Sequence, residues 1–364
     1  MCSVVICPVL SGEGVSVKRM FRMKFQNRIS LFSALLFLVS ACALAPAGDD
    51  STLLYGVKKA PPCPQGEIRL AAYNVENLFD DKDDPNLSGR FDDIGEVKPE
   101  SELKAVAAAI HAVNADIISL EEVESLEAVE WFRDKYLSDM GYKYAASIDV
   151  GYYRGIENAV LSRYPIIHSQ VWVGMKLDGE HPKLWNGRPN RYYGQPLTFR
   201  RSPLCVDIKV SDDYQLRLYV VHHKAGKGNE YWREAESRGV IKLVQQAEKE
   251  NPKINIAVLG DFNSQPEDLA IRQYLKAGLI DTQDYREVHC DKSAPLFVTH
   301  ESGRTLDYIF TNSALYCEVV PGSSFIFSTP ARPEGHDWRV DPLPKGYGSD
   351  HYPVAVDLIP RDGC

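Results

Sequence analysis

Eight polar residues of the metal-binding or acid–base type lie at the ends of stretches that resemble strands. They are, in chain order, Asn74, Glu122, His222, Asp261, Asn263, Asp307, Asp350 and His351. The densest group ends the segment INIAVLGDFN (254–263), whose apolar residues predict a buried strand that Gly260 breaks. Asp261 and Asn263 then stand two residues apart, so both side chains point to the same face. A carboxylate and a carboxamide in that place could hold a cation or stabilise a developing charge.

Each of these residues also has a simpler structural explanation. Gly, Asp and Asn are ordinary turn residues, so GDFN could be a turn, and Asn74 could cap another one. Glu122 could begin a helix, and His222 could be a buried histidine with satisfied hydrogen bonds. Asp350 and His351 could be polar loop residues. Their recurrence at successive strand ends favours one shared active site over eight separate structural roles.

The elements that position these residues alternate between strands and helices along the chain. The periodicity predicts strands at 67–74, 116–122, 142–149, 159–173, 204–210, 216–222, 254–259, 306–311 and 354–359. Helical spacing of apolar residues predicts helices at 101–113, 126–140 and 231–249. This interleaving indicates an α/β fold with one large domain.

A polar insertion at 178–203 interrupts this pattern. Three aromatic residues lie within it, namely Trp185, Tyr192 and Tyr193. Four arginines accompany them, namely Arg188, Arg191, Arg200 and Arg201. Guanidinium groups beside aromatic rings suit phosphate contact combined with base stacking, which predicts a substrate-binding role for the four arginines. The alternative is a loop that packs on the domain.

The first 42 residues have the composition of an export signal. Five basic residues precede the apolar run 31–39, and small residues follow it. The run is too short to span a bilayer in the mature protein. Val39-Ser40-Ala41-Cys42 resembles a bacterial lipobox, which predicts a lipid anchor at Cys42 on the outer membrane or in the periplasm. Cleavage after Ala45-Pro46-Ala47 would instead give a free, secreted protein, and Met20 or Met23 could be the true start.

Residues 43–66 are rich in Ala, Pro, Gly and Lys and predict a tether to a domain at 67–360. The chain is 44% hydrophobic and 25% charged, which is ordinary for a globular protein. Of 41 basic and 50 acidic residues the leader holds five and one, which leaves 36 and 49, a net charge of −13. This charge argues against tight, nonspecific binding to a phosphate backbone.

Of the eight cysteines, Cys2, Cys7 and Cys42 belong to the leader or anchor. Five remain, and an odd count leaves at least one thiol unpaired. Cys205 lies in the strand-like segment LCVDIKV, which predicts a buried free thiol. None of the cysteines has the paired spacing of a zinc site.

Seven motifs together resemble those of the endonuclease/exonuclease/phosphatase superfamily, which has the DNase-I-like fold. They are YNVEN (73–77), LEEV (120–123, similar to LQEV), NAVLSRYPI (158–166), HHKAG (222–226), GDFN (260–263), TLDYIF (305–310) and SDHYPV (349–354). The resemblance covers residues 68–358 in the family's order. It implies a four-layer α/β sandwich in which helices flank two central mixed β-sheets.

The resemblance also implies a role for each polar residue. Glu122, Asn74, Asp350 and Glu76 would hold or border a divalent metal, with Mg²⁺ as the default and Mn²⁺ or Ca²⁺ able to serve. His351 would be the general base, oriented by Asp307. Asp261 would position the nucleophile or protonate the leaving group, while Asn263 and His222 would hold the phosphoryl oxygens.

Three positions depart from the family pattern. Val221 replaces an Asn, Ala225 replaces a Ser, and Ile156 stands where the DNA-repair branch has Tyr, which counts against abasic-site repair. Because the first and last strands of this fold lie close together, the resemblance predicts a Cys63–Cys364 disulfide. Cys290 and Cys317 flank the Asp307 strand and are a second candidate pair.

These observations predict an exported, metal-dependent nuclease that cleaves DNA or RNA. The alternative is a phosphatase or a phospholipase C-type enzyme that uses the same site on sphingomyelin, an inositol phosphate or a phospholipid. The sequence shows no apolar hairpin of the kind that engages a bilayer, which favours the nuclease. A non-enzymatic surface lipoprotein is disfavoured because the set of site residues is complete. The sequence implies no protein partner.

Overall fold

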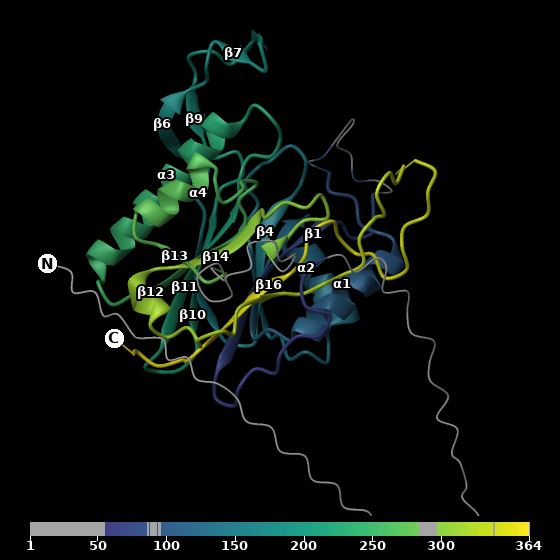
Figure 1. Cartoon of the computed structure of the whole chain (residues 1–364), viewed down its shortest axis with the longest axis vertical. Coiled ribbons are helices and arrows are strands. Elements are labelled where there is room, and N and C mark those ends of the chain that lie inside the picture. Colours follow the sequence, from purple (N-terminus) through teal and green to yellow (C-terminus); the bar gives the residue numbers. More distant parts are fainter. Residues whose placement is uncertain are drawn as a thin grey trace, which may run out of the picture. The chain divides into compact units, whose positions relative to one another are not determined.

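Two six-stranded β-sheets face each other in a computed structural model, and helices cover their outer faces (Figure 1). The structure describes residues 55–85, 87, 93, 96–283, 297–337 and 339–363. This architecture confirms the predicted four-layer α/β sandwich with two mixed sheets. The leader 1–42, with Cys42, lies outside the described residues.

Both sheets mix parallel and antiparallel strands. The first has the order β15 (Phe325–Ile326), β16 (Val354–Leu358), β1 (Ile68–Leu78), β2 (Ile117–Val123), β4 (Glu157–Ser162) and β3 (Tyr144–Ser147). The second has the order β13 (Ile280–Asp281), β14 (Asp307–Thr311), β12 (Asn255–Asp261), β11 (Gln215–His222), β10 (Leu204–Lys209) and β5 (Ile166–Gln170). The helices are α1 (Glu100–Val113), α2 (Leu126–Tyr136), α3 (Glu230–Glu250), α4 (Leu269–Lys276) and the short α5 (Ser313–Tyr316).

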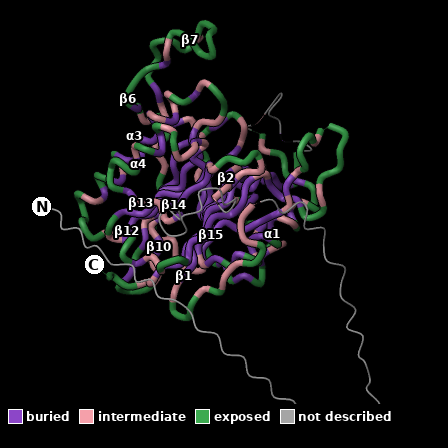
Figure 2. Tube along the Cα trace, in the orientation of Figure 1, coloured by how far each residue is buried: buried purple, intermediate pink, exposed green. Residues whose placement is uncertain are grey.

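Alternation along each strand divides the core into three apolar layers. In β1, Leu70 and Ala72 belong to the layer between the sheets, while Ala71 and Tyr73 pack in the layer that contains α1 and α2. In the second sheet, odd and even residues likewise divide between the layer between the sheets and the layer that contains α3 and α4. Both faces of every central strand are therefore covered, which explains why these strands are nearly continuous apolar runs (Figure 2).

The segment 159–173, predicted as one strand, is two strands in different sheets. β4 ends at Ser162 in the first sheet, and β5 begins at Ile166 in the second. Pro165 lies between them, and proline lacks the N–H that a continuous central strand would need. This crossing joins the two sheets covalently.

The second half of the predicted tether is part of the domain. Val57 pairs with Phe327 in a parallel bridge, and its N–H donates to the carbonyl of Ile326 at 2.8 Å. The Tyr55 ring lies 6.0 Å from that of Tyr352. Within the part of the chain that the structure describes, no helix combines the length and the apolarity needed to cross a bilayer.

The predicted Cys63–Cys364 disulfide is wrong, because Cys63 is a free thiol. Burial and the neighbouring Asp357 carboxylate raise the pKa of Cys63 to about 12, so this thiol stays protonated and unreactive. Cys205 is the buried free thiol that the sequence predicts. Cys317 is in a disulfide, but Cys290 and Cys364 lie outside the described residues, so the Cys290–Cys317 pair stays a prediction.

A buried ion pair joins the first and last long strands. Arg69 and Asp357 are register partners on β1 and β16, and both are almost fully buried. The Arg69 Nε and Nη2 atoms donate to the two Asp357 carboxylate oxygens at 2.7 and 3.0 Å. The remaining Arg69 donors bond the carbonyls of Val113 and Pro61. One guanidinium group therefore ties together β1, β16, the end of α1 and the segment before β1.

We predict that Arg69→Met lowers the free energy of unfolding by about 3–5 kcal/mol, because it leaves the buried Asp357 carboxylate uncompensated. Urea denaturation monitored by circular dichroism measures this loss. The matched control is Arg133→Met, because Arg133 pairs with Asp134, whose side chain is 69% exposed. The control should cost less than about 1 kcal/mol, and equal costs for the two variants would contradict the prediction.

Candidate active site

Two rows of polar side chains, one on each sheet, meet at the same end of the sandwich. In the second sheet, His222, Asp261 and Asp307 are register neighbours on β11, β12 and β14. Each lies two residues along its strand from an apolar residue of the layer between the sheets, so these polar side chains continue that face. In the first sheet, Asn74 on β1 and Glu121 on β2 are register neighbours on the same inner face.

Asp261 is the centre of this group and is almost fully buried. Its Oδ2 atom accepts hydrogen bonds from Nδ2 of Asn263 at 2.8 Å and from Nδ2 of Asn74 at 3.2 Å. Nε2 of His222 lies 3.4 Å from the same oxygen, and Nε2 of His351 lies 3.9 Å from it. Burial and the nearby Asp307 carboxylate raise the pKa of Asp261 to about 6, although His351 opposes them. Asp261 can therefore exchange a proton near neutral pH.

Asp307 orients His351. Its two carboxylate oxygens lie 3.0 and 2.9 Å from Nδ1 of His351. If Nδ1 carries the proton donated to Asp307, Nε2 is left as the free base and faces Asp261. Burial lowers the pKa of His351, but the Asp307 and Asp261 carboxylates outweigh it and raise the pKa well above its usual value. The two carboxylates therefore strengthen the basicity of His351, and Asp307 holds its ring in one orientation.

Glu122 offers an open carboxylate beside these groups. A register shift in β2 and a φ of 63° at Glu122 separate its side chain from the regular strand pattern. Among the described residues its carboxylate accepts no hydrogen bond. Nη2 of the Arg154 guanidinium lies 3.9 Å from it, and Nε2 of His222, whose pKa burial lowers well below its usual value, lies 3.6 Å from it. A partly buried carboxylate without a hydrogen-bond donor fits a ligand of a hard divalent cation.

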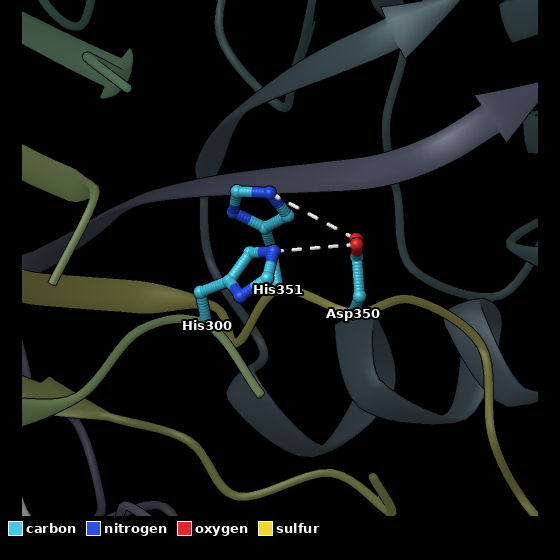
Figure 3. A group of neighbouring side chains, drawn as sticks. All are labelled: His300, Asp350 and His351. Atoms are coloured by element: carbon cyan, nitrogen blue, oxygen red, sulfur yellow. Dashed lines mark ion pairs between the residues drawn. The ribbon is translucent and has the colours of Figure 1, made fainter. Parts of the chain in front are cut away.

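Asp350 faces two neighbouring histidines, His300 and His351 (Figure 3). Its Oδ2 atom is 3.3 Å from Nε2 of His300, and its Oδ1 atom is 3.8 Å from Nε2 of His351. One ligand atom from each of the three residues lies within 4.8 Å of the others, and the base role of His351 leaves Asp350 and His300 available to a metal ion. Burial opposes ionisation, but His300, His351 and Arg332 outweigh it, so the pKa of Asp350 is well below its usual value. The ionised carboxylate is the form that binds a metal.

Glu76 is engaged by the protein. Its Oε2 atom accepts hydrogen bonds from Oη of Tyr347 at 2.6 Å and from the main-chain N–H of Asp350 at 3.0 Å. Its Oε1 atom lies 3.7 Å from Nη2 of Arg332. Metal binding by Glu76 stays a prediction, and these contacts show that Glu76 holds the 347–350 segment against β1.

Glu121 is a buried acid that the sequence reasoning did not single out. Its side chain is fully buried and accepts a hydrogen bond from Oγ of Ser119 at 2.8 Å. Burial raises the pKa of Glu121 well above its usual value and so favours the neutral carboxyl. It lies against Gly260, where a Cβ would come within 2.8 Å of the carboxyl and 2.3 Å of the Val221 carbonyl. The Gly of GDFN is therefore required by close packing between the two sheets.

The four predicted substrate arginines divide into three situations. Arg201 is buried, and its Nε and Nη2 atoms donate to the carbonyls of His222 and His223 at 3.0 and 2.6 Å. Arg200 lies over the rings of Tyr153 and Tyr152, 4.4 and 4.6 Å from their centroids. Arg188 and Arg191 lie in the insertion, where they line a cavity with Arg200. Arg201 thus supports the turn that carries His222, and its substrate contact stays a prediction.

Three further residues of the site were not predicted from the sequence. They are Arg154, His300 and Arg332, which contact Glu122, Asp350 and Glu76 through space. His300 stands five residues before TLDYIF, and this proximity to a motif was the only signal in the sequence. Arg154 likewise stands four residues before NAVLSRYPI, whereas Arg332 lies in a loop without any recognisable motif.

Comparison with known proteins supports the assignment of the fold. A model of the Endonuclease/Exonuclease/phosphatase family matches residues 71–351. Among curated proteins, no sequence matches this chain. The human Nocturnin catalytic domain with bound sulfate superposes with a TM-score of 0.52 at 18% identity, over 81% of this chain and 95% of that one.

Two further solved structures show the same fold. Truncated TDP2 from Caenorhabditis elegans gives a TM-score of 0.51 at 15% identity, over 80% of this chain and 97% of that one. An endonuclease/exonuclease/phosphatase from Beutenbergia cavernae gives a TM-score of 0.50 at 17% identity, over 81% of this chain and 72% of that one. At these identities the similarity establishes the fold, and the residues of this chain must supply the chemistry.

We predict that His351→Ala and Glu122→Gln fail in different ways. Loss of the base should lower kcat by about 10²–10⁴-fold while metal affinity and folding stay near those of the wild type. Loss of one anionic ligand should first weaken metal binding, by about tenfold or more. Isothermal titration with Mn²⁺, together with kcat for a small phosphodiester, separates the two effects. Near-normal turnover by His351→Ala would rule out His351 as the base.

Proposed function

We propose, because the chain belongs to the endonuclease/exonuclease/phosphatase family, that it is a nuclease that hydrolyses phosphodiester bonds of DNA or RNA. Members of this family are metal-dependent phosphoester hydrolases, and this chain is one of them. The proposal adds three points to this activity: the substrate is a nucleic acid, the protein is exported, and the metal is Mg²⁺.

The catalytic side chains are arranged for attack of water on phosphorus. His351, held by Asp307 through Nδ1, would take the proton of the attacking water at Nε2. Asp261, with its raised pKa, lies 3.9 Å from this nitrogen and would deliver a proton to the leaving oxygen. His222 and Asn263 flank the same Asp261 oxygen and would donate hydrogen bonds to the phosphoryl oxygens as charge develops.

Glu122 and Asp350 are the residues that would hold a divalent cation, with Asn74 at its border. A bound cation would offset the charge that develops on the phosphoryl oxygens. The carboxylate and carboxamide oxygens favour Mg²⁺, and Mn²⁺ or Ca²⁺ could replace it.

Cationic and aromatic side chains next to the catalytic residues carry the nuclease proposal. The guanidinium of Arg154 lies beside Glu122. Arg200 stacks on Tyr153, whose ring is half exposed. A polynucleotide offers both the anionic phosphates and the flat bases that such groups bind.

One observation bears on the phosphatase or phospholipase C-type alternative. The sequence indicated no apolar hairpin. In the structure β7 (Leu184–Trp185) and β8 (Arg188–Pro189) form a short hairpin of mixed polarity, in which Leu184 is 55% exposed. Its tip is the polar pair Asn186-Gly187, and Nδ2 of Asn186 donates to the carbonyl of Lys227 at 3.1 Å. Because the tip is polar and fastened to the domain, the hairpin is poorly suited to enter a bilayer. This favours the nuclease over a lipid-cleaving enzyme.

The substrate panel is the direct test. We predict that the protein from residue 43 cleaves DNA or RNA with Mg²⁺, and that excess EDTA abolishes cleavage. Single- and double-stranded DNA, RNA, sphingomyelin and an inositol phosphate would be offered under identical conditions. Turnover of sphingomyelin or the inositol phosphate alone would keep the catalytic assignments and replace the nuclease with the alternative.

The leader supports export and a lipid anchor at Cys42. We predict that, in a bacterial host, the full chain fractionates with membranes and that Cys42→Ser moves it to the soluble exported fraction. Cell fractionation with immunoblotting measures this. If the wild type and Cys42→Ser were both soluble, the secreted alternative would replace the anchored one.

A further inference from the structure

The insertion builds a cavity of about 1190 Å³ outside the catalytic centre. The strands β6 (Lys176–Glu180) and β9 (Pro196–Thr198) pair beside α3, and the β7–β8 hairpin extends beyond them (Figure 1). Asn186 at the hairpin tip and Trp185 in β7 hydrogen-bond the loop before α3, so they fasten one wall to the other. The cavity is therefore held open by a fixed frame.

The charged side chains that line this cavity are all cationic. None of its lining residues is acidic, and Arg188, Arg191, Arg200 and Lys224 all line it. Among the described residues, none of these four cations lies within ion-pairing distance of a carboxylate, whereas Arg217 forms a two-bond pair with Asp207. Like charges gathered without partners repel one another, and a bound anion would relieve that repulsion. In a chain with a net negative charge, such a concentration of cations points to an anionic ligand.

The walls also offer flat apolar surfaces. Trp185 and Tyr192 are 44% and 39% exposed, and the Trp185 ring is fixed by donation from Nε1 to Oδ1 of Asn229 at 3.0 Å. Tyr231 and Trp232 stack on each other on the opposite wall. Exposed rings that are held in place can stack with a nucleobase at little cost in side-chain entropy.

The cavity adjoins the catalytic centre through two short connections. Tyr153 lines the cavity, and the next residue, Arg154, reaches to within 3.9 Å of Glu122. Lys224 lines the cavity two residues after His222. A nucleotide chain with one phosphate at Asp261 could therefore place a neighbouring nucleotide in the cavity.

We propose that this cavity binds an unpaired nucleobase together with its phosphate, so that the enzyme acts on single-stranded nucleic acid. The inference rests on the proposed nuclease function. In a duplex the faces of each base are covered by its neighbours, and a base must leave the stack before side chains can stack on it. A concave site lined by rings and cations selects strands whose bases are already free.

The test compares a single-stranded oligonucleotide, a blunt duplex of the same sequence and bis(4-nitrophenyl) phosphate. The wild type should show kcat/KM at least about tenfold higher on the single strand than on the duplex. Trp185→Ala should lower kcat/KM on the single strand by about 10- to 100-fold, chiefly through KM, and Trp185→Phe should restore most of it. Arg188→Met/Arg191→Met should also raise KM and weaken its dependence on salt.

The matched control is Arg272→Met, which removes an exposed arginine on α4 that does not line the cavity, and its rates should equal those of the wild type. Equal losses on the duplex and the single strand, or equal losses on bis(4-nitrophenyl) phosphate, would overturn the cavity proposal. Circular dichroism melting excludes a variant that simply unfolds.

Failure of the nuclease proposal itself would look different. The wild type would then hydrolyse bis(4-nitrophenyl) phosphate but cleave no nucleic acid. In that event, fluorescence anisotropy with a labelled single strand and the His351→Ala variant decides the cavity separately. Binding that Trp185→Ala abolishes would support the cavity, and an absence of binding would overturn it.

Discussion

The arrangement of polar side chains at one end of the sandwich depends on a buried carboxylate at the junction of the two sheets. Asp261 ends β12 in the second sheet and accepts a hydrogen bond from Asn74 in the first sheet. A buried charge is tolerated only where hydrogen bonds and opposite charges surround it, so neighbouring strand ends must present donors. Asn263, His222 and His351 fulfil that requirement, and they are also the groups that the chemistry needs. Stability and catalysis therefore make the same demand on this end of the sandwich.

The carboxylate also constrains the backbone around it. Gly260 has a φ of 121° and no room for a Cβ, because Glu121 and the Val221 carbonyl pack directly against it. Burial raises the pKa of Glu121 well above its usual value, which disfavours a second buried negative charge between the sheets. The sheets can approach closely enough for Asn74 to reach Asp261 because Gly260 has no side chain and Glu121 packs directly against it.

The residues of the proposed substrate cavity and the candidate catalytic residues come from different segments of the chain. The catalytic residues lie at strand ends of the sandwich, whereas the cationic cavity is built almost entirely by the insertion and the start of α3. The insertion can therefore change shape and charge without disturbing the Asp261 network. Arg201 connects the two parts, since it belongs to the end of the insertion but is committed to the main chain of His222 and His223. Its burial explains why only part of the arginine cluster is available to a ligand.

The sequence alone determined the α/β class, most of the central strands and the choice of candidate catalytic residues, because alternation along a strand and short motifs are local properties. Asp261, Asp307 and His351 stand at the ends of strand-like segments, and such segments can be recognised from the sequence. Contacts between distant segments were decided only by the tertiary structure. Tyr347 bonds Glu76 across 271 positions, and Cys63 lies beside Asp357 as a free thiol. The contacts of Arg332 and His300 with Asp350 also join distant segments. The division of 159–173 between two sheets depends on which strands pair, and that pairing is decided by the packing of the whole fold.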